Sequence, residues 1–287
     1  MARKVITLTS DLGTSDYYVA SIKGYIYSNV DDVTIVDISH NLVAFDVVEA
    51  AYLLKSCYKD FPEGTIHIIG VDSEPIINFG PNNGSFPSIL IMDGHYFISN
   101  DNGFFGTLVG ERRDLQFYRL DHILSNPKAF QFPTKNILCK AAIELISGKS
   151  LDEMASPEEG FKTALSPLPI IEDKLIKGHV IHIDSYGNAI TNITRELFER
   201  EKGDSQFTIY FRSKSYYIDE ISPSYNTVPP GERVAIFNEN NLLEIAINRA
   251  AKNGTGGANK LFGLNRNDLI RIEFTSQGSH NTLNELF

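Results

Sequence analysis

Short apolar runs alternate with amphipathic segments along the first half of the chain. The runs at residues 5–9, 33–38 and 65–72 are rich in β-branched residues and end in polar turns, which predicts three strands. Between them, residues 16–29 and 46–58 carry apolar side chains at helical spacing, which predicts two helices. Strands that alternate with helices are typical of βαβ units and a parallel sheet.

Two further elements are expected in this half. Within residues 88–103, two β-rich runs flank the dipeptide Asp93-Gly94, which favours a tight hairpin turn. Residues 136–148 have helical spacing and end on a glycine, which predicts a helix.

The predicted helix at residues 46–58 carries its own start signal. Asp46 is a candidate N-cap, and Glu49 follows three residues later. This spacing is a variant of the capping box, in which each of the two side chains accepts a hydrogen bond from a backbone N–H at the start of the helix.

The pattern changes in the second half, where short β-rich runs follow one another with turn residues between them. Such regular spacing predicts an all-β sandwich or barrel. Residues 152–177 contain prolines and charges with little periodicity, which is typical of a link between domains. We therefore expect an N-terminal α/β domain with a largely parallel central sheet (1–151), a linker (152–177) and a smaller C-terminal all-β barrel domain (178–287).

Charge and hydropathy exclude several classes of partner. The net charge of the 287-residue chain is −10 and no basic stripe is present, so we expect no nucleic-acid partner. No segment approaches the roughly 18 apolar residues of a membrane span, and the first residues lack the apolar core of a signal peptide. We expect a cytoplasmic protein without a membrane partner.

Familiar catalytic signatures are absent. The sequence has no P-loop, no dinucleotide-binding glycine motif, no nucleophile elbow and no H-E-x-x-H. His179 and His182 stand three apart in a predicted strand, so they face opposite sides and cannot share a metal ion. We expect no metal and no cofactor.

Three acids stand at or near the ends of the predicted strands, namely Asp11, Asp37 and Asp72. Ligands of open parallel sheets collect outside the carboxyl ends of the strands. A carboxylate there can hold a ribose diol, pair with a cation or act as a base. The alternative for each acid alone is a loop or N-cap carboxylate.

Several blocks of sequence, in a fixed order, resemble one family. They include T-L-T-S-D-L-G-T-S-D-Y-Y-V (7–19), I-V-D-I-S-H (35–40), F-D-V-V-E-A-A (45–51), I-D-S-Y-G-N-A-I-T-N-I (183–193) and L-E-I-A-I-N (243–248). The chain is similar to the S-adenosylmethionine hydroxide adenosyltransferases and to their relatives, the fluorinase and chlorinase. The resemblance implies S-adenosylmethionine as substrate, adenosine and methionine as products, and a homotrimer whose sites lie between domains of neighbouring subunits.

The resemblance also assigns three acids to the substrate. Asp11 would hold the ribose hydroxyls, Asp16 would face the methionine moiety, and Asp184 would bind the methionine ammonium. Carboxylates suit both diols and ammonium groups because they accept several hydrogen bonds.

The remaining contacts that the resemblance implies are aromatic or amide side chains. Phe45 stands where an aromatic ring packs against the adenine, and Phe132 where another apolar ring packs. Tyr186 follows the ammonium-binding acid, Asn188 would lie toward the pocket, and Asn248 would meet the adenine edge.

The water-activating residues of the family are altered here. Family hydrolases use an Asp, an Arg and a His, and only Asp72 has a counterpart. The segment 73–87 contains no arginine, and Pro133 and Lys135 stand where the family has His and Arg. Asp72, Glu74 and Thr134 are therefore the candidate catalytic residues.

Three functions remain open from the sequence. The first is hydrolysis of S-adenosylmethionine with an altered water-activating group. The second is binding of S-adenosylmethionine or adenosine without turnover, since a protein that has lost the water-activating triad can still retain the acids that bind the substrate. The third is a halogenase, because the fluorinase has a serine near the position of Thr134, although other residues of its halide pocket are not evident.

Overall fold

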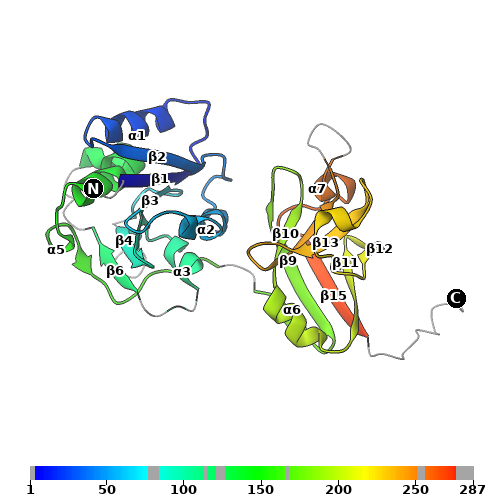
Figure 1. Cartoon of the computed structure of the whole chain (residues 1–287). Helices are drawn as coiled ribbons and strands as arrows, with labels where there is room; N and C mark the ends of the chain where they lie inside the picture. Colours follow the sequence, from blue (N-terminus) through cyan, green and yellow to red (C-terminus); the bar gives the residue numbers. More distant parts are fainter. Residues whose placement is uncertain are drawn as a thin grey trace, which may run out of the picture. The chain divides into compact units, whose positions relative to one another are not determined.

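The computed structural model describes residues 4–76, 84–110, 112, 115–120, 127–165, 168–250 and 256–275. The chain divides into two compact units, Met1–Ser166 and Pro167–Phe287 (Figure 1). Each unit has its own sheet and its own hydrophobic core.

The first unit is built on a seven-stranded sheet with the order β2-β1-β3-β5-β4-β6-β7. Its strands are β1 (Lys4–Ser10), β2 (Val33–Ser39), β3 (Ile66–Gly70), β4 (Pro87–Met92), β5 (His95–Asn100), β6 (Gln116–Arg119) and β7 (Ser156–Pro157). Strand β1 runs parallel to β2 and β3, and β3 runs parallel to β5.

The rest of this sheet is antiparallel, so the expectation of a largely parallel sheet holds for only half of its pairings. The cause is the hairpin predicted at Asp93 and Gly94, which joins β4 to β5. Both turn residues have positive φ, of 51° and 75°, as a tight two-residue turn requires.

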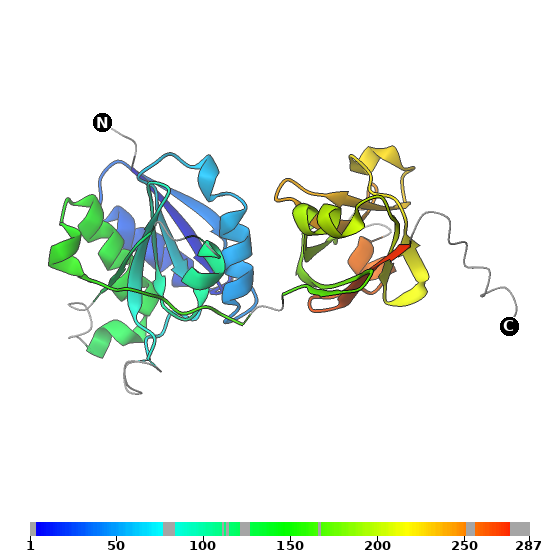
Figure 2. The ribbon, with the colours of Figure 1, turned by 90° about the horizontal axis from the view of Figure 1, so that it is seen from below.

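Helices cover both faces of this sheet (Figure 2). On one face, α1 (Tyr18–Tyr27) packs with a π-helix, η4 (Thr134–Cys139), and with α4 (Lys140–Ile146). On the other face lie α2 (Val47–Lys55) and α3 (Phe104–Val109). Short helical turns complete the unit: η1 (Tyr58–Asp60), η3 (Pro127–Gln131) and α5 (Leu151–Met154).

Of two local predictions for these helices, the role of Glu49 needs correction. Asp46 caps α2 as expected, since its Oδ1 accepts the Glu49 N–H at 2.8 Å, but the Glu49 carboxylate accepts from the backbone of Val43 at 3.0 Å. The helix expected at residues 136–148 is present, and it consists of the π-helix η4 followed by α4.

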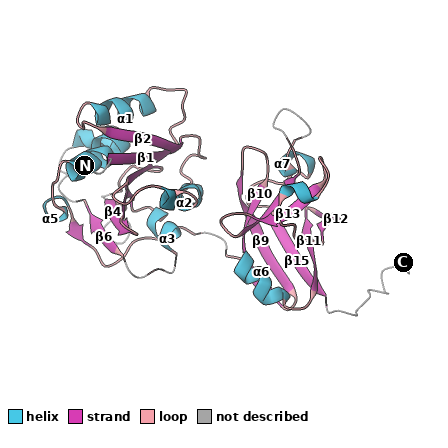
Figure 3. Ribbon diagram, in the orientation of Figure 1, coloured by secondary structure: helices cyan, strands magenta, loops and turns pink. Residues whose placement is uncertain are grey.

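The second unit is an antiparallel sheet with the order β12-β11-β15-β9-β10-β14-β13, and β8 pairs with β9 beside it. Its strands (Figure 3) are β8 (Ile170–Glu172), β9 (Leu175–Ile183), β10 (Ala189–Thr194), β11 (Gln206–Phe211), β12 (Ser213–Ile218), β13 (Arg233–Phe237), β14 (Leu242–Ile247) and β15 (Leu269–Thr275). The Arg233 guanidinium lies 5.1 Å from the centre of the Tyr217 ring. The two edge strands therefore approach each other, and the sheet is a nearly closed barrel.

The second unit also contains helices, which the sequence pattern did not predict. They are α6 (Arg195–Lys202), α7 (Ala258–Leu261) and the short turn η5 (Tyr225–Thr227). The expected linker, 152–177, contributes β7 to the first sheet and β8 to the second. In the parts of the chain that the structure describes, no helix is both long and apolar enough to cross a bilayer.

Candidate functional site

The strand order of the first unit reverses between β1 and β3. From β1 the chain passes through α1 to β2 on one side, and then through α2 to β3 on the other side of β1. Ser10 and Gly70, the last residues of β1 and β3, are direct neighbours in the ladder. Ligands of open α/β sheets bind at such a switch point, outside the carboxyl ends of the strands. Asp11 and Asp72 follow those two ends.

Asp11 fixes the position of Phe45. Its Oδ2 accepts the backbone N–H of Phe45 at 2.8 Å. Phe45 has a left-handed backbone, with φ of 67°, and its side chain is 72% exposed. A bulky residue adopts this backbone at a cost and only where its surroundings hold it. This hydrogen bond links two of the predicted substrate residues, Asp11 and Phe45. Asp16, another predicted substrate residue, is exposed in the loop before α1.

Asp72 is a half-buried carboxyl on a strained turn, with φ of 45°. Burial raises its pKa, and the charges of Asp11 and Glu74 act in the same direction, whereas a hydrogen bond from Asn102 opposes them. The turn itself is held by two amides. Asn102 Nδ2 donates to the Asp72 carbonyl at 2.9 Å, and Asn100 Nδ2 donates to the Glu74 carbonyl at 3.1 Å. The side chain of Glu74 is exposed.

Thr134 lies beside the same turn. Its side chain is buried, and its Oγ1 is 2.9 Å from the hydroxyl of Ser73. It packs on the end of β3 so closely that a Cβ on Gly70 would lie 2.6 Å from Thr134 Oγ1. The π-helix η4 begins at Thr134, and π-helical turns are frequent at functional sites. Asp72 and Thr134 are therefore both neighbours of Ser73, the first along the chain and the second through a hydrogen bond.

Phe132 is partly buried against the first helix. Its ring makes an edge contact with the Tyr18 ring, with centroids 5.4 Å apart, and the Lys135 ammonium lies 5.2 Å from its centre. The Lys135 cation thus lies over an aromatic ring, which is an attractive contact.

A second group of polar residues lies behind Asp11, and of its members only Asp37 was singled out from the sequence. Ser10 Oγ lies 2.7 Å from His40 Nδ1, and His40 Nε2 lies 3.2 Å from Asp37 Oδ1. Lys23 donates to the other oxygen of Asp37 at 2.5 Å. Burial opposes ionisation of Asp37, but the hydrogen bond from Lys23 and the contact with His40 outweigh it and lower the pKa. The His40 carbonyl accepts the Gly13 N–H at 2.7 Å, so this group holds the 10–13 turn.

The remaining predicted residues belong to the second unit. Asp184, Tyr186 and Asn188 line a hollow of about 270 Å³ together with Tyr225 and Arg249. Asp184 Oδ1 accepts the backbone N–H groups of Tyr186 and Asn188 at 2.8 and 2.9 Å, and Oδ2 accepts the Asn188 amide at 3.0 Å. The carboxylate is therefore held in one orientation, in a hollow that Arg249 also lines.

Two buried polar residues lie near this hollow. Glu244 accepts from the Tyr225 hydroxyl at 2.5 Å and from the Asn238 amide at 3.2 Å, and burial raises its pKa. Asn248 donates to the Val228 carbonyl at 2.6 Å and is not among the lining residues. Because the side-chain nitrogen of Asn248 donates to Val228, its predicted contact with adenine would use the side-chain oxygen.

The candidate residues thus form two groups, one in each unit. Neither group resembles a metal centre, because no three His, Cys, Asp or Glu side chains within the described ranges are placed to hold an ion.

Two family models match the chain. The N-terminal domain of the SAM hydroxide adenosyltransferases matches residues 6–155, and the C-terminal domain of the same family matches residues 178–271. The chain belongs to the SAM hydroxide adenosyltransferase family. The resemblance expected from the ordered motifs is confirmed.

Curated relatives of this family member carry two kinds of name. An (R)-S-adenosyl-L-methionine hydrolase from Methanocaldococcus jannaschii is 29% identical over 67% of this chain and 68% of the relative. A protein of the same name from Thermus thermophilus is 26% identical over 92% of this chain and 97% of its own. A fluorinase from Nocardia brasiliensis is 27% identical over 69% of this chain and 74% of its own.

The fold has a close counterpart among solved structures. An uncharacterised conserved protein from Thermotoga maritima superposes with a TM-score of 0.75 over 93% of this chain and 99% of its own, at 22% identity. That likeness concerns the fold alone.

Proposed function

We propose that the protein hydrolyses S-adenosyl-L-methionine to adenosine and L-methionine. The observation that carries the proposal is the pair of acids at the switch point, Asp11 after β1 and Asp72 after the neighbouring β3. The names of the two hydrolase relatives support it. Those names specify the (R) form of the substrate, so both forms belong in the assay.

The reaction places specific demands on these two acids. The oxygen of water forms a bond to ribose C5′ while the C5′–S bond breaks, and the bonding pair passes to sulfur, which leaves as a neutral thioether. One proton of the water must then be accepted. We assign that role to Asp72, because a carboxyl with a raised pKa is a better proton acceptor than an ordinary one. Asp11 holds the ribose hydroxyls.

The remaining substrate contacts follow the same logic. Phe45, which projects into solvent beside Asp11, offers a ring face to the adenine, and Phe132 supplies a second apolar ring. Asp16 faces the methionine moiety. Asp184, kept in one orientation by its three hydrogen bonds, accepts the methionine ammonium.

Tyr186, Asn188 and Asn248 complete the substrate contacts in the second unit. The resemblance further supports a cytoplasmic homotrimer, in which the acids of the first unit and the hollow of the second meet across subunits, and a reaction without a cofactor.

The altered triad implies a different arrangement around the water. We propose that Asp72 orients the water with help from Glu74 and from the hydroxyl of Thr134, which is linked to the turn through Ser73. The Lys135 ammonium lies over the Phe132 ring and donates a hydrogen bond to Ser21 Oγ at 3.2 Å. It therefore does not act as the missing arginine.

Two other functions make distinct predictions. Pro133, where the family has a histidine, favours a protein that binds S-adenosylmethionine or adenosine without turnover. The fluorinase relatives and the hydroxyl pair of Ser73 and Thr134 favour a halogenase. The same assay, run without halide and with fluoride or chloride, separates the three.

The test follows adenosine and methionine by chromatography after incubation of the purified chain with each form of S-adenosylmethionine in halide-free buffer, with calorimetric titration alongside. Adenosine in proportion to enzyme supports the hydrolase. In Asp72→Asn we expect turnover to fall by about 10² or more with little change in affinity, whereas Asp11→Ala weakens binding first. Asp31→Asn, at an exposed acid before β2, is the matched control. Equal loss of binding and turnover in Asp72→Asn contradicts the assignment of Asp72.

A further inference from the structure

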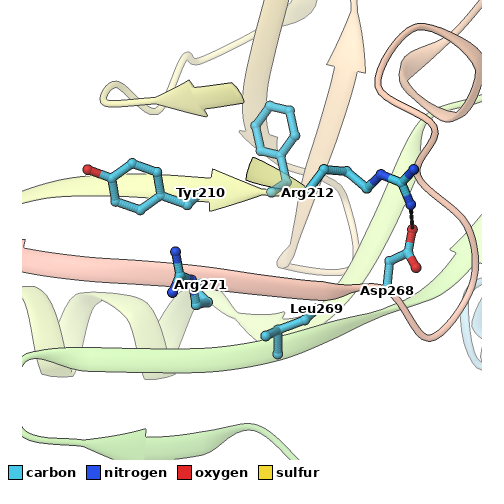
Figure 4. A pocket seen from close by; sticks show the side chains of 6 residues that line it. Tyr210, Arg212, Asp268, Leu269 and Arg271 are labelled. Carbon is cyan, nitrogen blue, oxygen red and sulfur yellow. Dashed lines mark ion pairs between the residues drawn. The ribbon is translucent and has the colours of Figure 1, made fainter. Parts of the chain in front are cut away.

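Asp72 has a backbone conformation that no hairpin turn imposes on it. Its φ of 45° lies in the left-handed region, which costs energy for any residue with a Cβ. Arg212, just after the end of β11 (Figure 4), has a similar φ of 64°, because it lies in a tight turn between two paired strands. Asp72 lies in no such turn, since β3, the strand before it, pairs with β1 and β5, which both run parallel to it. A contact from elsewhere must therefore hold Asp72.

The side-chain amide of Asn102 makes that contact. Its Nδ2 donates to the Val71 carbonyl at 3.1 Å and to the Asp72 carbonyl at 2.9 Å. An amide nitrogen carries two hydrogens, so it can make both bonds at once. One side chain thus binds two successive carbonyl groups of the backbone.

Two successive carbonyl groups define the conformation of the residue between them. Because the peptide group is planar, the direction of the Val71 carbonyl fixes the plane before the Cα of Asp72, and the direction of the Asp72 carbonyl fixes the plane after it. The two planes together determine φ and ψ of Asp72, and with them the direction of its Cα–Cβ bond. The amide of Asn102 therefore sets the direction in which the Asp72 carboxyl leaves the backbone.

The turn that carries Asn102 is itself held on both sides. Asp101 Oδ1 accepts the Lys162 N–H at 2.9 Å, and the Gly103 carbonyl accepts the Ala164 N–H at 3.1 Å. Gly103 has a φ of 105°, and a Cβ on it would lie 2.6 Å from the Ala164 nitrogen, so only glycine permits this close approach. The segment that leads to the second unit thus clamps the turn, and Asn102 has little freedom to move away from Asp72.

Asn102 also affects the charge of Asp72. Burial and the charges of Asp11 and Glu74 raise the pKa of Asp72, whereas the Asn102 amide acts in the opposite direction. A carboxyl must be ionised before it can accept a proton from water. Asn102 therefore keeps Asp72 in the reactive form down to a lower pH than burial alone would allow.

We propose that Asn102 is a positioning residue for Asp72, which it directs toward the attacking water by fixing the backbone on both sides of that residue. This inference rests on the role of Asp72 in the proposed function. Substrate binding is assigned to other side chains, Asp11 among them. Loss of the Asn102 amide should therefore lower kcat and leave KM nearly unchanged.

The two ends of the amide serve different neighbours, so they can be tested separately. Asn102 Oδ1 accepts the N–H of Phe104, the first residue of α3, at 3.3 Å. Asn102→Asp keeps this acceptor but has no N–H for the carbonyl groups of Val71 and Asp72, whereas Asn102→Ala loses both ends. If Asn102 only supported α3, the Asp variant would be as active as the unmodified chain. If Asn102 positions Asp72, both variants are impaired.

The experiment measures kcat and KM of the whole chain for both forms of S-adenosylmethionine over a range of pH. We expect kcat to fall by about 10- to 100-fold in Asn102→Asp and Asn102→Ala, as for a displaced catalytic group, with KM nearly unchanged. The fall of kcat in acid should also move to higher pH. Asn29→Ala is the matched control, because Asn29 Nδ2 likewise donates to a backbone carbonyl, that of Tyr25 at 2.7 Å. It should behave as the unmodified chain, and circular dichroism checks that all variants are folded.

A second measurement does not depend on turnover. The pKa of Asp72 is read by NMR from its side-chain carboxyl carbon in a chain with isotopically labelled aspartate, and the signal is assigned by its absence in Asp72→Asn. We expect a higher pKa in Asn102→Ala than in the unmodified chain and in Asn29→Ala. If the unmodified chain forms no adenosine, the proposed function fails, and this comparison still decides the role of Asn102. An unchanged Asp72 pKa in Asn102→Ala, or an unmodified kcat in Asn102→Asp, overturns the proposal.

Discussion

The buried histidine pair in the first unit should make this protein sensitive to acid. His67 has no exposed surface, its Nδ1 lies 2.7 Å from Thr7 Oγ1, and its Nε2 lies 3.2 Å from His95 Nδ1. Its ring stacks on Phe97 with centroids 4.9 Å apart. Burial, reinforced by His95, lowers the pKa of His67 to about 3.

The folded state therefore prefers neutral His67, whereas the unfolded chain protonates it near pH 6.5. The stability that depends on neutral His67 is complete above pH 6.5 and is lost as the pH falls toward 3. At pH 4.5, two units below the unfolded pKa, the loss is about 2.7 kcal/mol, at about 1.36 kcal/mol for each unit.

The perturbation is His67→Gln, which keeps a polar side chain of similar size but cannot titrate. The chain has no tryptophan, so urea unfolding is followed by far-UV circular dichroism at pH 8 and at pH 4.5. We expect the unmodified chain to lose about 2.7 kcal/mol more than the variant between these two pH values.

Thr7→Val is the matched control, because it removes a hydrogen-bond partner of His67 but leaves the titrating group in place. This variant should be less stable at both pH values and should keep the steep loss in acid. If the unmodified chain and His67→Gln lose equal stability between pH 8 and pH 4.5, the argument from burial is wrong.

Three further changes test the supports of the candidate site. Gly70→Ala should destabilise the first unit by about 1–3 kcal/mol and lower turnover, because its Cβ would displace Thr134; urea unfolding and the adenosine assay measure both. His40→Ala should weaken adenosine binding in calorimetry by loosening the 10–13 turn, while His40→Asn, whose side-chain oxygen takes the place of Nδ1 beside Ser10, should retain most of the affinity; equal adenosine affinities of the Ala and Asn variants would contradict this role. Asp46→Ala should cost about 1 kcal/mol in urea unfolding, because it removes the cap of α2.

The elements that local chemistry decides were predictable from the sequence. The three parallel strands β1, β2 and β3 are runs of β-branched residues, and the Asp93-Gly94 turn fixes the hairpin. By contrast, α6 is eight residues long and mostly polar. It forms because Thr194 Oγ1 accepts the Leu197 N–H at 3.1 Å and because Leu197 and Phe198 are buried in the barrel core, which periodicity does not reveal.

The candidate site was predictable only in part for a similar reason. Motif and strand-end position located Asp11 and Asp72, but their proximity depends on strand order, which only the assembled sheet defines. The contact of Ser10 with His40 spans 30 residues. The Asp37-x-x-His40 spacing within I-V-D-I-S-H was the one available signal for it.

The position of β15 has a consequence for how the chain folds during synthesis. This strand, the last one among the residues that the structure describes, lies between β11 and β9 and pairs with both. On the ribosome, the first unit can bury its core while the second is still being made, since domains fold from the N-terminus as they emerge. The barrel cannot. Until residues 269–275 leave the exit tunnel, β9 and β11 each expose an edge with unpaired N–H and C=O groups. Such an edge can pair with a strand of another chain. Nascent chains of this protein should therefore depend on chaperones mainly in the interval between the emergence of β11 and the emergence of β15.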